Sequence, residues 1–368
     1  MKLVAQTSPY IRKKVSVKRM MLDVIIALIP VTLFAMIQNG WNGIYVFLIS
    51  IATMLFTELF CHMLIKWPKG MKRRELFSKE GLKKIKGLYT INNITAPLIS
   101  ALIYALILPA GCNPYVVLIG ALFGMLVGKM VFGGLGSNIF NPAAVGRIFV
   151  GICFGSKLAE AYPNGAVDVV AGATPLGHTM GGNLLNVNFY KMSDIILGNI
   201  PGSMGEVSTV CILLGAIYLF ARRSADLRAC LGYLVSFGIV MSVACLSVYS
   251  QNTDANLLKM IIFQMCTGGL LFGAVFMITD PVTSPTTKFG RVLFGALAGC
   301  ITALIRVCGA YPEGVAFSIL IVNMLAPTID HFMKGKPNKY TWKQCAVLVA
   351  LIAVVSCILS ASVMGGWF

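Results

Sequence analysis

The residues best suited to chemistry in this sequence are acidic side chains inside or beside long apolar runs. Glu58 lies in the middle of the apolar run 44–65, and His62, four residues later, shares its face of a helix. A carboxylate in apolar surroundings is costly without a partner or a water path, so Glu58 is a candidate for binding a cation or carrying a proton. The alternative is a structural hydrogen bond between Glu58 and His62 or a neighbouring helix.

Three further acidic residues are weaker candidates for the same ion pathway. Asp280 lies in the helix-breaking stretch TDPVTSP, and broken backbone at membrane depth occurs where it lines a cavity or is packed in protein. Glu206 and Asp330 lie near the ends of apolar runs, where a charged group that reaches the membrane surface is an equally good explanation. The same explanation applies to the basic residues Lys129, Arg147 and Arg306.

One threonine stands out in the longest polar stretch of the chain. Residues 165–182 read GAVDVVAGATPLGHTMGG, with Thr174 among glycines and other small residues. An acceptor of a covalent group must fit a modifying enzyme's site, and Gly172 and Ala173 provide slim backbone while Pro175 stiffens the exit. This stretch is either an ordinary loop or a tether for an attached group.

Other chemistry is not indicated. The eleven cysteines include no C-x-x-C pair and most lie inside apolar runs, so we expect small buried hydrophobic residues and no metal site within this chain. The histidines are scattered and suggest no catalytic triad. The sequence has no GxxxxGK[ST] phosphate loop, which argues against an ATP-driven pump. We therefore assign no catalytic residue.

The composition shows which elements must position these residues. The chain is 57% hydrophobic and only 12% charged, about half the charged fraction of a soluble domain, which indicates an integral membrane protein. We expect no cleavable signal peptide, because the first 20 residues are polar and basic. Apolar runs of about the length of a membrane span lie at about 21–38, 44–65, 91–110, 115–132, 139–155, 206–221, 229–247, 259–279, 291–309, 314–330 and 345–365. The sequence predicts an all-α polytopic membrane protein with about ten to eleven transmembrane helices.

The distribution of basic residues predicts the orientation. The net charge of +17 could suggest nucleic acid, but the basic residues cluster between apolar runs, as in cytoplasmic loops. With the N-terminus in the cytoplasm, every cluster falls inside: 12–19, 66–90, 222–228, 288–291 and 334–343. The stretch 156–205, which contains Thr174, then falls outside the membrane. We expect contact with lipid and no binding of nucleic acid.

The glycine pattern predicts an internal repeat. LIGALFGMLVGKMVFGGLGSN at 118–138 matches VLFGALAGCITALIRVCGAYPEG at 292–314, with glycines in register at an offset of 175. Five helices per copy make the second copy inverted, a plan common in proteins that move ions or solutes. The alternative is a shared helix-packing face of Gly120, Gly124 and Gly128. The predicted segments are an N-terminal cytoplasmic segment (1–20), a first repeat (21–155), an outer loop (156–205), a second repeat (206–331), and a basic linker with an extra helix (332–368).

Six motifs, taken together, resemble a known family. They are TSPYIRKKVSVKRMMLDVIIALIP, GGLGSNIFNPAAVGR, GATPL, GSMGEVS, TDPVTSPTTKFGR and YPEGVAFSILIVNMLAPTID. From about residue 8 to residue 331 the chain resembles the subunit designated D in the Rnf complex. It is similar, less closely, to the subunit designated B in the sodium-pumping NADH:quinone reductase. The latter usually has a longer N-terminal extension, which favours Rnf.

The resemblance implies a redox role. Rnf complexes couple electron flow between ferredoxin and NAD to Na⁺ or H⁺ translocation, and the subunit that this chain resembles carries FMN on a threonine within D-x-x-S/T-G-A-T. Asp168, Gly172, Ala173 and Thr174 match this pattern, so Thr174 would be the acceptor; Ala171 replaces the usual hydroxyl residue. Proteins of this family also bind riboflavin non-covalently.

The resemblance also implies partners. They would be the other Rnf subunits, membrane and peripheral, including a second flavin subunit and iron–sulfur subunits, so that the chain is not active alone. The helix 345–365 is additional to the family's ten, and we expect it to contact a partner. The alternative function is an inverted-repeat transporter or channel with no redox role, which would show no flavin fluorescence in a denaturing gel.

The orientation can be tested with single cysteines. A cysteine at position 78 (Ser78→Cys), in the basic loop 66–90, should resist a membrane-impermeant thiol reagent applied to intact cells. A cysteine at Asn164 should react, unless a partner subunit covers it. Labelling of the unsubstituted chain gives the background, and labelling of position 78 from outside would reverse the assigned sides.

Overall fold

A computed structural model describes residues 16–65, 91–162, 176, 191–198, 200–206, 208–251, 256–309, 314–333 and 341–365, and these ranges contain helices and no strand. The elements, in chain order, are α1 (Val17–Ile65), α3 (Asn92–Leu106), α4 (Pro114–Met125), the π-helix η2 (Leu126–Met130), α5 (Pro142–Cys153), α6 (Gly155–Glu160), α7 (Met192–Leu197), α8 (Thr209–Arg222), α9 (Leu227–Gln251), α10 (Leu257–Cys266), α11 (Leu270–Phe272), the π-helix η4 (Gly273–Met277), α12 (Lys288–Cys308), α13 (Val315–Phe332) and α14 (Trp342–Met364).

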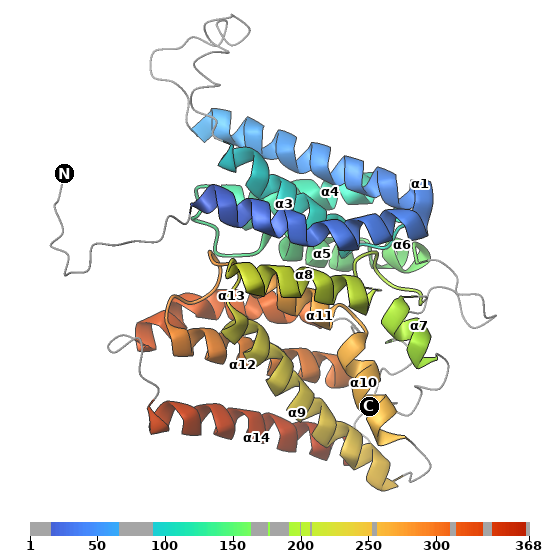
Figure 1. Ribbon diagram of the computed structural model, residues 1–368, viewed down its shortest axis with the longest axis vertical. Coiled ribbons are helices and arrows are strands. Elements are labelled where there is room, and N and C mark those ends of the chain that lie inside the picture. The colour runs from blue at the N-terminus through green and yellow to red at the C-terminus, as the bar shows by residue number, and fades with distance from the viewer. Residues whose placement is uncertain are drawn as a thin grey trace, which may run out of the picture.

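Each of the eleven apolar runs coincides with a helical segment. The first two runs form the two halves of α1, whose 49 residues would span about 70 Å as a straight helix, more than twice the hydrocarbon thickness. The helix bends instead at Gly40, where φ is 54° and ψ is −137°, and its second half runs back beside the first (Figure 1). Gly40 therefore makes one long helix into a pair of antiparallel segments.

The all-helical membrane fold is confirmed. By length and composition α1, α9, α12, α13 and α14 can each cross a membrane, and α10 with α11–η4, bent by 53°, would make a sixth candidate. The apolar helices α3, α4 with η2, α5 and α8 are shorter. The total of ten to eleven crossings therefore stays a prediction.

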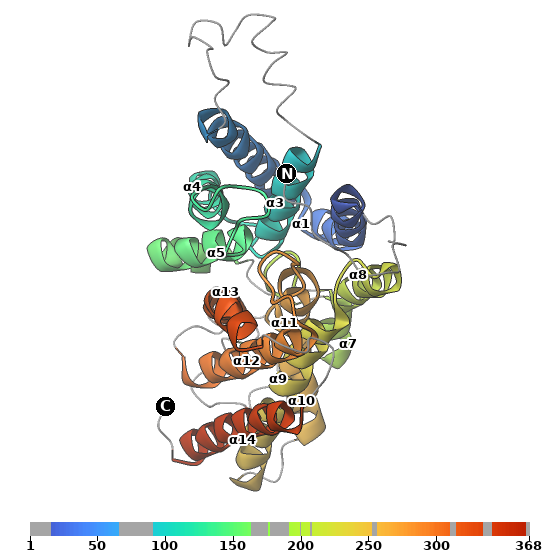
Figure 2. The same cartoon turned by 90° about the vertical axis from the view of Figure 1, so that its left-hand side faces the viewer.

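The helices form two groups. Figures 1 and 2 both place α1, α3, α4 and α5 in the upper part of the molecule and α9, α10, α12 and α14 in the lower part, with α8, α11 and α13 between them. Helix α14 lies at the edge and packs on α9 and α12, but Ser356 and Leu359 are its only buried residues. Its predicted contact with a partner subunit is untested.

Polar contacts join helix ends on two sides of the molecule. On the side where α1 begins, which we call the basic side, Asp23 accepts hydrogen bonds from Tyr218, Arg222 and Ser224 around the end of α8. Arg291 at the start of α12 pairs there with Asp226, which precedes α9. On the opposite side, Gln38 donates to the carbonyl of Gly198 over 2.8 Å. The helix ends that carry Arg222, Arg228 and Arg291 thus share one side, as the sequence predicts; which side faces the cytoplasm stays a prediction.

The predicted repeat pairs Gly124 with Gly299, but these two glycines pack against helices that are not equivalent in the two copies. A Cβ on Gly124 would lie 2.5 Å from the carbonyl oxygen of Pro142, at the start of α5. A Cβ on its counterpart Gly299 would lie 2.5 Å from the carbonyl oxygen of Tyr233, on α9. Under the repeat α5 corresponds to α13, and α9 to the second half of α1. The inverted repeat therefore stays a prediction.

The close approach of α9 and α12 makes Gly299 a sharp test of this packing. Gly299→Ala places a methyl group 2.5 Å from the Tyr233 carbonyl oxygen and should cost about 1–3 kcal/mol through forced separation of the helices. The matched control is Gly238→Ala in α9, whose Cβ would meet only the Met265 sulfur, at 3.7 Å. The readout is the thermal midpoint of the purified protein in detergent; equal midpoints would contradict the described packing.

Candidate functional site

Glu58 forms a buried ion pair with Lys129. The Lys129 ammonium donates to Glu58 Oε2, and each side chain is only 3% exposed. The structure therefore gives Glu58 a partner from a neighbouring element, while His62 Nε2 lies 3.5 Å from the amide nitrogen of Asn93. Removing one member of a buried pair leaves an uncompensated charge and typically costs about 3–5 kcal/mol.

The local backbone brings Lys129 to this position. Lys129 belongs to the π-helix η2, a widened turn that occurs often at functional sites. A Cβ on Gly128 would lie 2.8 Å from the Cα of Pro142, so glycine allows η2 to approach the start of α5. The backbone N–H of Gly134 donates to the Lys129 carbonyl over 3.2 Å, and Gly134 has a φ of 88°. The backbone at Lys129 is thus held by the packing of Gly128 on Pro142 and by the hydrogen bond from Gly134.

Lys129 also lines a cavity of about 510 Å³, which we call the basic-side cavity. Its walls come from the start of α1, α3, η2 and the following loop, α8, and η4 with its loop. Most lining side chains are apolar. The polar ones include Asn92, Ser100, Lys129, Asn138, Asn141, Ser224, Thr279 and Asp280. Glu58 is not among the lining residues, and Lys129 is the lining residue that contacts this carboxylate.

Asp280 lies on the wall of the same cavity, just beyond η4. Its carboxylate accepts hydrogen bonds from the Val282 N–H over 3.1 Å and from the Thr283 hydroxyl over 3.4 Å. Burial raises the pKa of Asp280 above its ordinary value, although these hydrogen bonds and the charge of Lys129 oppose the shift. The broken stretch TDPVTSP therefore lines a cavity, one of the two arrangements that its sequence predicts.

The membrane-surface explanation is wrong for Lys129 and Arg306, which are 3% and 4% exposed. Arg306 donates to the carbonyls of Gln264, Thr267 and Gly268 over 2.7–3.0 Å, and its guanidinium lies 4.9 Å from the ring centroid of Phe237. These hydrogen bonds satisfy carbonyl groups at the C-terminal end of α10, where the helix is interrupted before α11 begins.

Glu206 lies at this break as well, on the side opposite the basic-side cavity. Gly268 and Gly269 have φ values of 68° and 69°, and a Cβ on Gly269 would clash with Glu206 Oε1. The structure therefore does not bring Glu206 together with Glu58.

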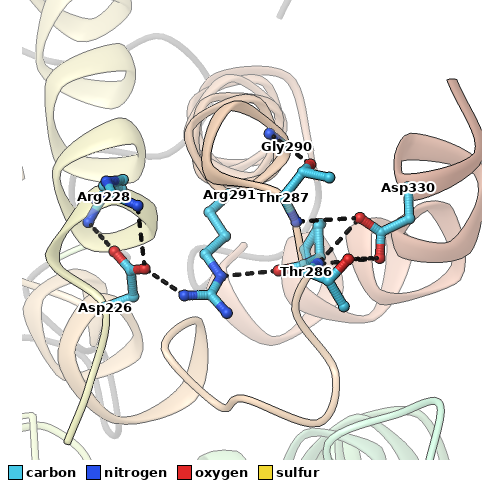
Figure 3. Close-up of polar contacts among 8 residues, drawn as sticks. Asp226, Arg228, Thr286, Thr287, Gly290, Arg291 and Asp330 are labelled. Carbon is cyan, nitrogen blue, oxygen red and sulfur yellow. Dashed lines mark hydrogen bonds and ion pairs between the residues drawn. The ribbon is translucent and has the colours of Figure 1, made fainter. Parts of the chain in front are cut away.

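Asp330 lies at the basic side, where it holds the start of α12 (Figure 3). Its carboxylate accepts from the backbone N–H of Thr286 over 3.0 Å and of Thr287 over 3.5 Å, and from the Thr286 hydroxyl over 3.1 Å. These contacts favour a structural role for Asp330. Its role in an ion pathway stays a prediction.

Asp226 makes the neighbouring contacts in Figure 3, and sequence reasoning did not single it out. It pairs with Arg291, whose Nε also donates to the Pro285 carbonyl over 2.8 Å. Burial alone would raise the pKa of Asp226, but the backbone N–H of Arg228 and the Arg291 guanidinium outweigh it and lower the pKa. The sequence does contain a signal for Asp226, because it is an acidic residue within the basic cluster 222–228.

The flavin pattern, Asp168, Gly172, Ala173 and Thr174, lies outside the described residues. The nearest described residue is Leu176, which is 3% exposed. Its Cδ1 lies so close to Gly268 that a Cβ there would clash with it.

An all-helical membrane fold that encloses paired charges beside a cavity is typical of proteins that move ions or solutes. The chain belongs to the NQR2, RnfD, RnfE family, whose sequence profile matches residues 4–339.

Three relatives show how this family is named. The chain is 31% identical to the subunit designated B of the Na(+)-translocating NADH-quinone reductase from Ectopseudomonas mendocina, over 90% of this chain and 87% of the relative. It is 30% identical to the subunit designated D of the ion-translocating oxidoreductase complex from Stutzerimonas stutzeri, over 87% and 92%. It is 32% identical to the subunit designated D of the proton-translocating ferredoxin:NAD(+) oxidoreductase complex from Clostridium ljungdahlii, over 89% and 93%.

Proposed function

We propose that this chain is the flavin-carrying membrane subunit of an Rnf-type complex that relays electrons between ferredoxin and NAD and couples them to cation translocation. The observation that carries the proposal is the D-x-x-x-G-A-T pattern ending at Thr174 in a chain of this family. The relatives' names support membership of a multi-subunit ion-translocating oxidoreductase. The partners would be the other subunits of that complex, in a cell membrane, with the N-terminus of this chain in the cytoplasm.

The residues near Thr174 suit a tethered FMN. When bound, FMN supplies reversible electron transfer, while the protein fixes its position and tunes its potential. The Thr174 hydroxyl would carry the phosphate. Leu176, packed at the Gly268 break, would seat the chain just beyond the attachment point, and the nearby Arg306 guanidinium adds a positive charge to that region. A second, non-covalent flavin, riboflavin, is part of the proposal without an assigned site.

The cation pathway would run through the basic-side cavity. Glu58, buried behind Lys129, and Asp280 on the cavity wall are carboxylates at membrane depth or beside it. A carboxylate suits either Na⁺ coordination or proton carriage. The relatives' names include both a Na⁺-translocating and a proton-translocating complex, so they support either cation.

A second candidate is a membrane component of a sodium-pumping NADH:quinone reductase. Relatives of both kinds match this chain at 30–32% identity over most of its length. The substrates separate the two: the Rnf proposal requires ferredoxin-dependent reduction of NAD by the purified complex, and the alternative requires NADH-dependent reduction of quinone. The transporter without a redox role lacks comparable support.

The flavin proposal predicts a covalent FMN on Thr174. Thr174→Ala should abolish in-gel flavin fluorescence of this chain and the mass increment of one FMN, because the attachment needs the hydroxyl oxygen. Thr179→Ala, in the same stretch of sequence, is the matched control and should keep both signals. Fluorescence that persists in the Thr174 variant, or a flavin-modified peptide from another part of the chain, would refute the assignment.

The ion proposal predicts a specific loss on Glu58→Gln. The amide keeps the size of the side chain but not the charge, so the complex should keep its flavin and lose at least tenfold of its cation-dependent turnover. Glu160→Gln is the control, because Glu160 pairs with Lys157 at an exposed position. Assays use reconstituted complex at varied Na⁺ and pH, and an unchanged dependence on both would exclude Glu58 from the pathway.

A further inference from the structure

We propose that Lys129 is a built-in competitor of the translocated cation. Its ammonium occupies the Glu58 carboxylate when no cation is bound, and it swings toward Asp280 when a cation takes its place. The occupant is a monovalent cation, Na⁺ or H⁺. The inference rests on the proposed function in one respect, that Glu58 binds the translocated cation.

The position of Lys129 is the first argument. It contacts the Glu58 carboxylate and also lines the cavity wall. A cation that reaches Glu58 from the cavity along this side chain would therefore displace the ammonium or pass it. Asp280 on the same wall is close enough for its charge to attract that of Lys129, so the displaced ammonium has a second carboxylate to approach.

The charge count is the second argument. Glu58 and Lys129, which are buried, and the half-buried Asp280 together carry a net charge of −1 when all three are ionised, and charge withdrawn from water is costly when it is not compensated. His62 lies beside Glu58 and, when neutral, leaves this count unchanged. One additional monovalent cation brings the net charge to zero. The group therefore favours one cation: Na⁺ would be coordinated by carboxylate oxygens, and a proton would form an O–H bond with one of them.

The choice of a lysine is the third argument. Lysine is a compact charge on a flexible four-carbon stem, whereas arginine has a planar fork that is pre-organised for several acceptors. The two buried bases among the described residues differ in this way: Arg306 is held by three backbone carbonyls and lies over an aromatic ring, while the Lys129 ammonium is bonded to another side chain. With the Lys129 carbonyl fixed by Gly134, movement would be confined to the side chain.

A competitor of this kind has a consequence for turnover. A buried carboxylate with no internal rival would hold its cation tightly and release it slowly. An ammonium that returns to Glu58 expels the cation and restores the starting charge. Lys129 should therefore weaken cation binding and speed up cation release.

The decisive experiment uses the reconstituted complex with Lys129→Met. Electron transfer is measured against Na⁺ at fixed pH, and against pH at fixed Na⁺, so that the two cations are distinguished. For the translocated cation, the half-saturating concentration should fall at least tenfold, or the half-maximal pH should rise by at least one unit, while the maximal rate falls. Lys157→Met, from the exposed Lys157–Glu160 pair, is the control and should leave both values unchanged.

A second variant covers failure of Lys129→Met to assemble. Lys129→Arg keeps the charge, so the complex should form and keep its flavin, but a guanidinium holds a carboxylate by two hydrogen bonds. The half-saturating cation concentration should then rise at least tenfold, or the half-maximal pH fall by one unit. Values equal to those of the unsubstituted complex in the assembled variants would overturn the proposal. If Glu58→Gln also keeps its cation dependence, the ion part of the proposed function fails; if Glu58→Gln loses it, only the role of Lys129 fails.

Discussion

Charge withdrawn from water must be compensated within hydrogen-bonding distance, and this requirement organises the polar contacts of an otherwise apolar bundle. Glu58 is compensated by Lys129, the Arg306 guanidinium by backbone carbonyls, and Asp23 by donors from α8 and the residues after it. Each of these contacts joins elements that are distant in the chain. The positions of these charges therefore mark places where helices distant in the chain meet within an apolar core.

Irregular backbone occurs where these charges are compensated. The widened turn η2 presents Lys129, the loop after η4 presents Asp280, and the break between α10 and α11 exposes the carbonyls that Arg306 bonds. Regular helices satisfy their own backbone groups and leave none for such contacts. The irregular segments thus supply Lys129, Asp280 and the carbonyls that Arg306 bonds, while α1 supplies Glu58 and Asp23.

Some of this arrangement could be predicted from the sequence because it depends on local patterns. Apolar runs predict helices, since in lipid the backbone must satisfy its own hydrogen bonds, and all eleven runs are helical. The burial of Glu58 follows from its place in such a run. The partner of Glu58 could not be predicted, because Lys129 is 71 residues away and no periodicity relates the two.

The acidic candidates at helix ends show the same limit. Asp330 and Glu206 have similar sequence surroundings, yet Asp330 holds the start of α12 and Glu206 lies against Gly269 on the opposite side. Both lie near the ends of apolar runs, but the donor that each end offers depends on tertiary packing. The residues of the flavin pattern lie outside the described residues, so their part of the site stays a prediction from the sequence.

The segment from Leu270 to Met277 connects the two regions where function is proposed. At one end, Gly268 and Gly269 are packed by Leu176, Glu206 and Arg306; beyond the other end, Asp280 faces the basic-side cavity. A helical stretch of this length spans on the order of 10 Å. The glycine break packed by Leu176 and the cavity wall at Asp280 are therefore separated by little more than this one short helical segment.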